Sequence, residues 1–183
     1  MDYRSARSPK SFATFPIVGF VQGDGDGWVL AADGSHFWGR HGAAGLLLRA
    51  PQPGGGAAVL LQYRAPWSHQ GGTWGLPGGA LDSHESPEQA AVREAHEEAG
   101  LAGTALRVRS TVVTAEIVAL GGGRWSYTTV IADAAELLDT VANRESTELR
   151  WVAEEDVDGL PLHPGFAASW PRLRAVIAEL PLE

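Results

Sequence analysis

Residues Gly79–Leu101 read GALDSHESPEQAAVREAHEEAGL, and this stretch contains a helix with clearly marked ends. The hydroxyl of Ser86 can cap the helix, Pro87 suits its first turn, and Gln89 completes a capping box. Gly100 is a stop signal for the same helix. The stretch therefore predicts a loop, a capped helix and a second loop.

One face of the predicted helix is acidic. At about 100° per residue, Glu94, Glu97 and Glu98 fall within an arc of about 100°. Like charges at this spacing cost about 0.2–0.5 kcal/mol per pair, and a hard divalent cation, which prefers oxygen ligands, can offset that cost. The alternative is a solvated acidic surface in which Arg93 pairs with Glu97. Spacing alone does not decide between the two.

Glycine and proline clusters divide the rest of the chain into short elements. Apolar and β-branched runs predict six strands, at 28–32, 44–49, 57–64, 106–120, 126–132 and 147–152. The runs 111–120 and 124–132 predict a hairpin, and a second helix is expected at about 166–180, kinked or restarted at Pro171. Asp24 and Asp26 are expected in a plain turn, because Trp28 stands where a calcium loop needs a third carboxylate. The pattern predicts an α/β layered domain.

Composition limits the classes of function. With 183 residues, of which 44% are hydrophobic, we expect one folded domain at residues 28–183 after an extended lead-in at residues 1–27. The chain has no cysteine, which excludes disulfides and cysteine-ligated zinc. No apolar run is long enough for a transmembrane helix, so we expect a cytoplasmic protein that does not bind membranes.

The charge balance is acidic. Lys and Arg total 14 against 22 Asp and Glu, which gives a net charge of −8, and no basic cluster is present. Such a chain repels a phosphate backbone, so we expect no nucleic acid polymer as a partner.

The spacing of fixed residues gives the central stretch a family resemblance. After Gly79 come five residues, Glu85, seven residues, Arg93-Glu94-Ala95, one residue, Glu97-Glu98, one residue and Gly100-Leu101. This string resembles the Nudix box, G-x5-E-x7-R-E-U-x-E-E-x-G-U, at every fixed position, with Ala95 as a small aliphatic. The resemblance implies the Nudix α/β/α sandwich, with a mixed central sheet and a loop–helix–loop box.

The resemblance also implies a chemistry. Nudix enzymes hydrolyse a nucleoside diphosphate linked to another group, using a divalent metal held by the box. The implied cofactor is Mg²⁺, for which Mn²⁺ can substitute. The implied metal ligands are the carbonyl of Gly79 and the carboxylates of Glu94, Glu97 and Glu98. Glu94 can instead be the base, and Arg93 resembles the residue that orients a box glutamate, through Glu85.

Members of the family often take a further acidic ligand or base from outside the box. Glu145, on the turn before the last predicted strand, resembles this position best, with Glu148 and Glu116 as weaker candidates. An ordinary surface role for Glu145 is the alternative, because turns commonly carry acids.

Three residues are candidates for substrate binding: Arg64, Trp74 and Tyr127. Trp74, Trp125 and Tyr127 could stack on a nucleobase, although buried core positions are the commoner role of such aromatics. The expected partner is a small-molecule nucleotide, and a homodimer is left open.

Subfamily marks narrow the substrate by elimination. The downstream proline of ADP-ribose-cleaving members is missing, and Tyr127 lies too far from Leu101 for the diadenosine-polyphosphate mark. The coenzyme A mark is matched only in part. The remaining substrate class is the nucleoside triphosphates, which include oxidised purine nucleotides. Two rival hypotheses are a catalytically silent nucleotide-binding or regulatory Nudix module and a structural protein with an acidic helix.

Overall fold

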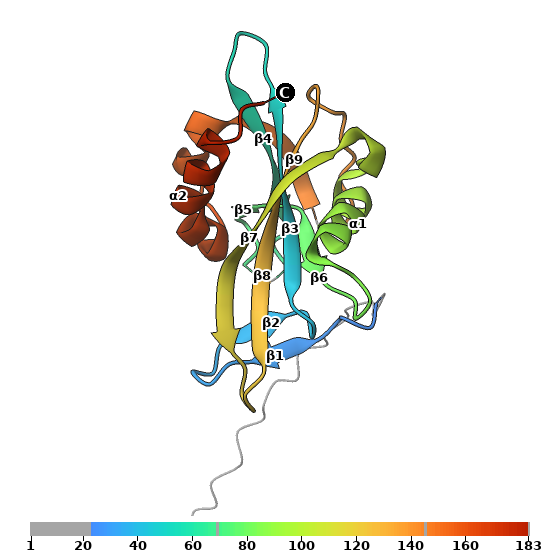
Figure 1. Cartoon of the computed structure of the whole chain (residues 1–183), viewed down its shortest axis with the longest axis vertical. Helices are drawn as coiled ribbons and strands as arrows, with labels where there is room; N and C mark the ends of the chain where they lie inside the picture. The colour runs from blue at the N-terminus through green and yellow to red at the C-terminus, as the bar shows by residue number, and fades with distance from the viewer. Residues whose placement is uncertain (1–22, 69, 145, 183) are drawn as a thin grey trace, which may run out of the picture.

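A mixed β-sheet is the middle layer of the protein (Figure 1). The computed structural model describes residues 23–68, 70–144 and 146–182. Helix α1 (Pro87–Ala99) covers one face of the sheet and helix α2 (Pro164–Ala178) covers the other. The expected α/β/α sandwich is confirmed.

The sheet has seven strands in the described residues, with the main order β5-β4-β3-β8-β7, while β6 pairs with β3 and β9 pairs with β4. Only the β3–β8 pair is parallel. The strands of this sheet are β3 (Ala43–Pro51), β4 (Ala57–Arg64), β5 (Trp74–Gly75), β6 (Gly78–Ala80), β7 (Arg107–Val118), β8 (Arg124–Asp133) and β9 (Ser146–Ala153). A single turn of 3-10 helix occupies Gly103–Ala105 (η1), and a longer 3-10 helix occupies Glu154–Gly159 (η2).

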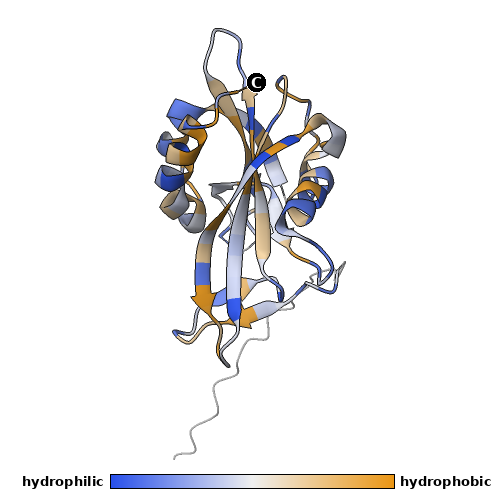
Figure 2. Ribbon diagram, in the orientation of Figure 1, coloured by the Kyte–Doolittle hydropathy of each residue, from blue (hydrophilic) through white to orange (hydrophobic). Residues whose placement is uncertain are grey.

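The central strand β3 is buried on both faces. Its residues Leu46 and Leu48 pack against the alanines of α1, whereas Leu47 packs against α2, because successive side chains of a strand point to opposite faces. Two hydrophobic cores result, one on the α1 side and one on the α2 side of the sheet. In Figure 2 the middle of β3 and β4 is apolar, and the hydrophilic segments lie mostly on the helices and loops.

Strands β3 and β4 diverge below their turn. They pair with each other only at residues 49–51 and 57–59; further on, β3 pairs with β6 and β4 pairs with β5 and β9. The chain from β5 to β6 crosses this gap, where the carbonyl of Pro77 accepts a hydrogen bond from Leu46 N at 2.8 Å. A Cβ at Gly78 would lie 2.4 Å from the carbonyl oxygen of Ala44, so only glycine fits this crossing. The crossing delivers the chain to α1 from the middle of the sheet.

Helix α1 has the ends that its sequence predicts. The hydroxyl of Ser86 accepts from Gln89 N at 3.2 Å, the Gln89 side chain accepts from Ser86 N at 2.8 Å, and Gly100 ends the helix in the left-handed conformation with φ 70°. Helix α2 starts at Pro164, two residues before the expected 166, and runs unbroken through Pro171, so the alternative of a restart there is wrong.

The predicted strands are present, with ends shifted by a few residues, and the β7–β8 hairpin turns at Gly121 and Gly122. Strand β1 (Trp28–Leu30) is shorter than expected and pairs with β2 (His36–Trp38), a strand that the sequence pattern did not predict. Strands β5 and β6 were missed as well. The missed strands have two or three residues each, which is too few to show a periodicity in the sequence. Strand β2 pairs with the nearby β1, β5 pairs with β4, and β6 pairs with the more distant β3.

The expected lead-in at residues 1–27 falls mostly outside the described residues, and its described part, 23–27, forms a turn. Among the described residues, no helix has the length and apolar character that crossing a membrane requires.

Candidate active site

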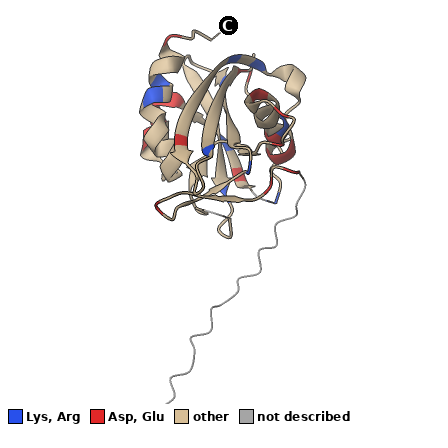
Figure 3. Cartoon of the chain, turned by 60° about the horizontal axis from the view of Figure 1, so that its bottom comes forward, with Lys and Arg blue, Asp and Glu red and all other residues tan. Residues whose placement is uncertain are grey.

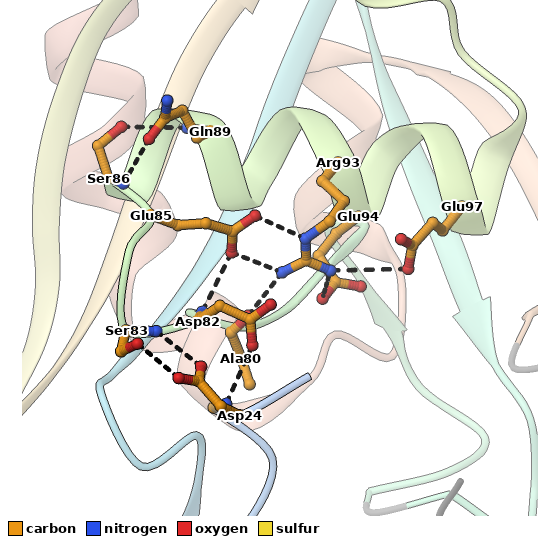
Figure 4. Close-up of polar contacts among 11 residues, drawn as sticks. Asp24, Ala80, Asp82, Ser83, Glu85, Ser86, Gln89, Arg93, Glu94 and Glu97 are labelled. Carbon is orange, nitrogen blue, oxygen red and sulfur yellow. Dashed lines mark hydrogen bonds and ion pairs between the residues drawn. The ribbon is translucent and has the colours of Figure 1, made fainter. Parts of the chain in front are cut away.

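Arg93 is at the centre of the polar contacts of α1 (Figure 4). Its Nε and Nη2 donate to the two carboxylate oxygens of Glu85 at 2.7 and 2.9 Å, and Nη2 also donates to the carbonyl of Ala80 at 2.9 Å. Its Nη1 donates to Glu94 Oε1 at 2.8 Å and lies 3.6 Å from Glu97 Oε2. The expected contact with Glu85 is present, and the pair with Glu97 that the surface alternative requires is the longest of these contacts.

The two-point contact between Arg93 and Glu85 fixes the charge of both groups. Hydrogen bonds from Arg93 hold the pKa of Glu85 below its usual value, and the hydrogen bond to Glu85 raises the pKa of Arg93. A planar guanidinium held at two points cannot rotate freely, so its remaining nitrogen presents a fixed donor to Glu94. Arg93 therefore orients the carboxylate of the next residue.

The three box glutamates lie at a packing border. The side chain of Glu97 is 42% exposed and that of Glu94 15% exposed, whereas Glu98 is buried at 4%. Glu98 Oε2 accepts a hydrogen bond from Gly78 N at 2.7 Å, which ties the helix to the chain crossing between β5 and β6. The acidic face thus extends from solvent to the middle of the sheet.

The carboxylate of Glu94 lies directly against Gly79. A Cβ added at Gly79 would lie 2.5 Å from Glu94 Oε1, so the glycine leaves room for the carboxylate beside the main chain. Carboxylates beside a main-chain segment are an oxygen-only donor set, which fits a hard divalent cation such as Mg²⁺.

The carboxylate oxygens of the three glutamates are not gathered into one compact group. Within residues 23–68, 70–144 and 146–182, the one group of three or more ligating side chains gathered within 4.8 Å is Asp24, Asp82 and His84. Because Arg93 contacts Glu94 and Glu97, a cation among the box glutamates has to compete with a guanidinium. The fit of a divalent cation to this site therefore rests on the oxygen donors and on the space at Gly79.

Tyr127 and Arg64 belong to the same neighbourhood. The hydroxyl of Tyr127 faces Gly45, where a Cβ would lie 2.1 Å from it. Burial raises the pKa of Tyr127, the charges of Glu98 and Glu94 raise it further, and Arg64 opposes them. The hydroxyl consequently stays protonated at neutral pH and lies within electrostatic range of Arg64 and of two box glutamates.

Trp74 and Trp125 have core positions. Trp74 is 4% exposed, with the ring of Tyr63 at 5.0 Å and the guanidinium of Arg150 over its face at 4.7 Å. Trp125 is 5% exposed, and its indole nitrogen donates to the carbonyl of Gly39 at 2.9 Å. Of the two alternatives for Trp74, this placement favours the core role over nucleobase stacking, because Tyr63 and Arg150 already contact its ring.

The candidate acids outside the box differ in their placement. Glu145 lies outside the described residues. Glu148 pairs on the sheet with Tyr63, whose ring packs on the α2 side, and forms an exposed ion pair with Arg150. Glu116 forms an exposed ion pair with Arg124. Glu148 is therefore not directed at the α1 side of the sheet.

Sequence reasoning missed the contacts of the loop before α1. The main-chain nitrogen of Asp82 donates to Glu85 Oε2 at 3.1 Å, and Ser83 and Asp82 bind the turn at Asp24 and Gly25. These partners are separated by 57 and 59 residues, and the only sequence signal was the Asp-Gly repeat of a turn.

Replacing Gly79 tests the space for Glu94. In Gly79→Ala we expect turnover to fall about 10- to 100-fold, because the new methyl displaces the Glu94 carboxylate by about an ångström. Thermal stability should change little, since the carboxylate is the flexible end of a side chain. Gly159→Ala is the control, because nothing lies within 4 Å of its added Cβ. Equal turnover of Gly79→Ala and the unmodified chain would contradict the assignment.

Known proteins resemble this chain in sequence. The family model of the NUDIX domain matches residues 39–175. A Mycobacterium tuberculosis protein named "Putative 8-oxo-dGTP diphosphatase 3" is 70% identical over 162 residues, which cover 88% of this chain and 75% of that protein. A Bifidobacterium longum "Nucleoside triphosphate pyrophosphatase/Nudix hydrolase fusion protein" is 40% identical over 170 residues, covering 90% of this chain and 34% of that protein.

Solved structures of other proteins share this fold. The crystal structure of RenU, a Nudix hydrolase from M. smegmatis, superposes with a TM-score of 0.85 at 73% identity and covers 87% of this chain and 99% of that one. The C. elegans Ap4A hydrolase, at 23% identity and a TM-score of 0.59 over 75% of this chain and 98% of that one, shares the fold. The box, the sandwich and these matches together show that the chain belongs to the Nudix family.

Proposed function

We propose that this chain hydrolyses a pyrophosphate bond of a small nucleotide with a divalent cation, and that the substrate is a nucleoside triphosphate, in particular an oxidised purine nucleotide. The name of the Mycobacterium tuberculosis relative supports the substrate class. The missing ADP-ribose and diadenosine-polyphosphate marks point the same way. The net charge of −8 makes a cation necessary, because an acidic protein otherwise repels a polyphosphate.

One observation carries the proposal: Glu85 fixes Arg93 at two points, and Arg93 presents Glu94 against Gly79. A solvated acidic surface needs no such chain of contacts. A bound cation at this place would supply Lewis-acid polarisation of the phosphate and a lowered pKa of bound water.

The chain's own groups divide the remaining tasks. The Glu94 carboxylate, oriented by Arg93, can bind the cation or accept the proton of the attacking water. The protonated hydroxyl of Tyr127 can donate a hydrogen bond to a phosphate oxygen, and Arg64 supplies positive charge nearby. We keep Arg64 and Tyr127 as the proposed substrate contacts.

Glu145 is proposed as the base outside the box. Its described neighbours support this role: Asn143 N donates to the main-chain carbonyl of Glu98 at 3.3 Å, and the hydroxyl of Ser146 accepts from the buried Gln62 amide at 2.7 Å. Asn143 and Ser146, on the two sides of Glu145, thus connect to the end of α1 and to β4.

A nucleotide panel tests the function. We expect 8-oxo-dGTP, and to a lesser degree dGTP, to be cleaved with Mg²⁺ or Mn²⁺ into the nucleoside monophosphate and pyrophosphate, with ADP-ribose and diadenosine tetraphosphate resistant. Products are identified by chromatography and mass spectrometry. Binding of nucleotide and metal without turnover of any compound would favour the silent regulatory module instead.

Metal titration distinguishes the enzyme from a structural acidic helix. Mg²⁺ or Mn²⁺ should raise the unfolding temperature, since a cation present at 100 times its Kd stabilises the folded chain by about 2.7 kcal/mol. We expect Glu94→Gln to reduce this stabilisation, and His84→Ala, which alters the separate cluster of Asp24, Asp82 and His84, to retain it. Stabilisation that persists in Glu94→Gln and disappears in His84→Ala would place the cation elsewhere.

A further inference from the structure

The turn before β1 rests on the loop that leads into α1. The two carboxylate oxygens of Asp24 accept hydrogen bonds from Ser83, one from its main-chain nitrogen at 2.8 Å and one from its hydroxyl at 2.5 Å. Gly25 N donates to Asp82 Oδ1 at 3.0 Å. Figure 3 shows the acidic start of the described chain beside α1, and Figure 4 shows Asp24 directed at Ser83. This turn lies outside residues 39–175, which the family model matches.

The turn and the loop are in close main-chain contact. A Cβ at Gly25 would lie 1.8 Å from the carbonyl oxygen of Leu81, so a side chain there would force the two segments apart. The carbonyl of Gly25 accepts from Arg40 N at 2.7 Å, and Leu81 N donates to the carbonyl of Gly42 at 3.0 Å. The loop is therefore held from two sides by the segment at residues 23–42.

Hydrogen bonds continue from this loop to α1. Asp82 N donates to Glu85 Oε2 at 3.1 Å, the same oxygen that accepts from Arg93 Nη2 at 2.9 Å. Arg93 in turn holds Glu94 through Nη1 at 2.8 Å. Glu85 thus has one donor from the loop and two from Arg93, and the loop donor depends on the position of Asp82.

We propose that Asp24 is a positioning residue of the active site, which holds the loop at Asp82 and Ser83 so that Glu85 keeps Arg93 and Glu94 in place. The effect on turnover rests on the proposed function, whereas the effect on cation binding does not. A segment beyond the matched family domain is then part of the catalytic framework.

The alternative role of Asp24 is that of a metal ligand, because Asp24, Asp82 and His84 are gathered within 4.8 Å. Both oxygens of Asp24 already accept from Ser83, and one oxygen of Asp82 accepts from Gly25. Each oxygen of Asp24 thus has a donor from the protein without a cation, which favours the positioning role.

Substitution of either partner tests the proposal. In Asp24→Ala and in Ser83→Ala we expect the Kd for Mn²⁺, measured without nucleotide by electron paramagnetic resonance, to rise about three- to tenfold, since a lost hydrogen bond has an effect of this size. Turnover at subsaturating Mg²⁺ should fall by a similar factor with little change in KM. Asp24→Asn, which keeps one acceptor oxygen, should recover part of the loss.

A matched control is available in the neighbouring hairpin. Asp33 also accepts a main-chain hydrogen bond, from Ser35 N at 2.9 Å, but this contact lies within the turn between β1 and β2. Asp33→Ala should leave both the Mn²⁺ affinity and turnover unchanged. Equal losses in Asp33→Ala and Asp24→Ala would show general destabilisation and overturn the proposal.

A double substitution tests the path through Glu85. If Asp24 acts through Glu85, Asp24→Ala should have little further effect in a Glu85→Gln background. Independent, multiplying effects would overturn the proposal, as would unchanged Mn²⁺ affinity in Asp24→Ala. A loss in His84→Ala with none in Ser83→Ala would assign Asp24 to a metal site instead. If the unmodified chain cleaves no nucleotide, the proposed function fails while the Mn²⁺ measurements still decide the role of Asp24.

Discussion

Glu97→Gln and Glu98→Gln should each lower turnover by about two to three orders of magnitude while the chain stays folded. Each change exchanges a charged carboxylate for a neutral amide and leaves the shape of the side chain intact. Glu97 is largely exposed, so its loss removes only a contact of 3.6 Å with Arg93. In Glu98→Gln the amide oxygen can still accept the hydrogen bond from Gly78 N.

The measurement combines kcat at saturating Mg²⁺ with a thermal unfolding curve for each variant. Glu88→Gln is the control, since Glu88 lies in the first turn of the same helix, away from Arg93. Glu98→Ala should differ from Glu98→Gln in stability, because it leaves Gly78 N without its partner, at a cost of about 1–3 kcal/mol. Full activity of Glu97→Gln and Glu98→Gln, or unfolding of either, would show that these carboxylates are not catalytic ligands.

The ends of α1 could be predicted to the residue because they depend on local chemistry. Ser86, Gln89 and Gly100 determine the caps through contacts within five residues, and such contacts are readable in the sequence. The hairpin of β7 and β8 was predictable for the same reason, since one glycine turn joins its two strands.

Long-range pairing could not be predicted in this way. Strand β6 exists because Gly78 and Gly79 lie against β3, and nothing in three residues indicates that partner. The burial of Trp74 likewise depends on β4, on β9 and on the bridge to Leu162, which are separated along the chain.

The local features of the candidate site were predictable from the sequence, and those that depend on long-range contacts were not. The spacing of Arg93, Glu94, Glu97 and Glu98 on one helix follows from the helical repeat, so the acidic face was predictable. The depth of each carboxylate was not, because the burial of Glu98 depends on the chain crossing at Gly78. The contact between Asp24 and Ser83 was not predictable either, because the two residues are 59 positions apart in the sequence.

Asp133→Ala should destabilise the folded chain by about 3–5 kcal/mol, a large share of the 5–15 kcal/mol typical of a domain. Asp133 is 4% exposed at the end of β8. Its carboxylate accepts from Arg49 Nε of β3 at 2.9 Å and from Arg109 Nη1 of β7, so a single acid pairs with two guanidinium groups on the neighbouring strands.

The cost is large because of what the substitution leaves behind. Arg49 is 2% exposed and also donates to the carbonyls of Ile177 and Leu180, at 3.1 and 2.9 Å, at the end of α2. Without Asp133 this buried guanidinium keeps its charge and loses its acidic partner, and the anchoring of α2 to the sheet weakens with it.

Urea unfolding of Asp133→Ala beside Asp158→Ala separates a buried pair from an exposed one. Asp158 forms an ion pair with Arg174 at 2.7 Å, but both side chains are about half exposed, so its loss should cost at most about 1 kcal/mol. Because the two variants remove the same charge, a difference between them isolates the effect of burial. Equal midpoints for both variants would mean that Arg49 finds water or another acceptor when Asp133 is gone, and that the end of α2 does not depend on this pair.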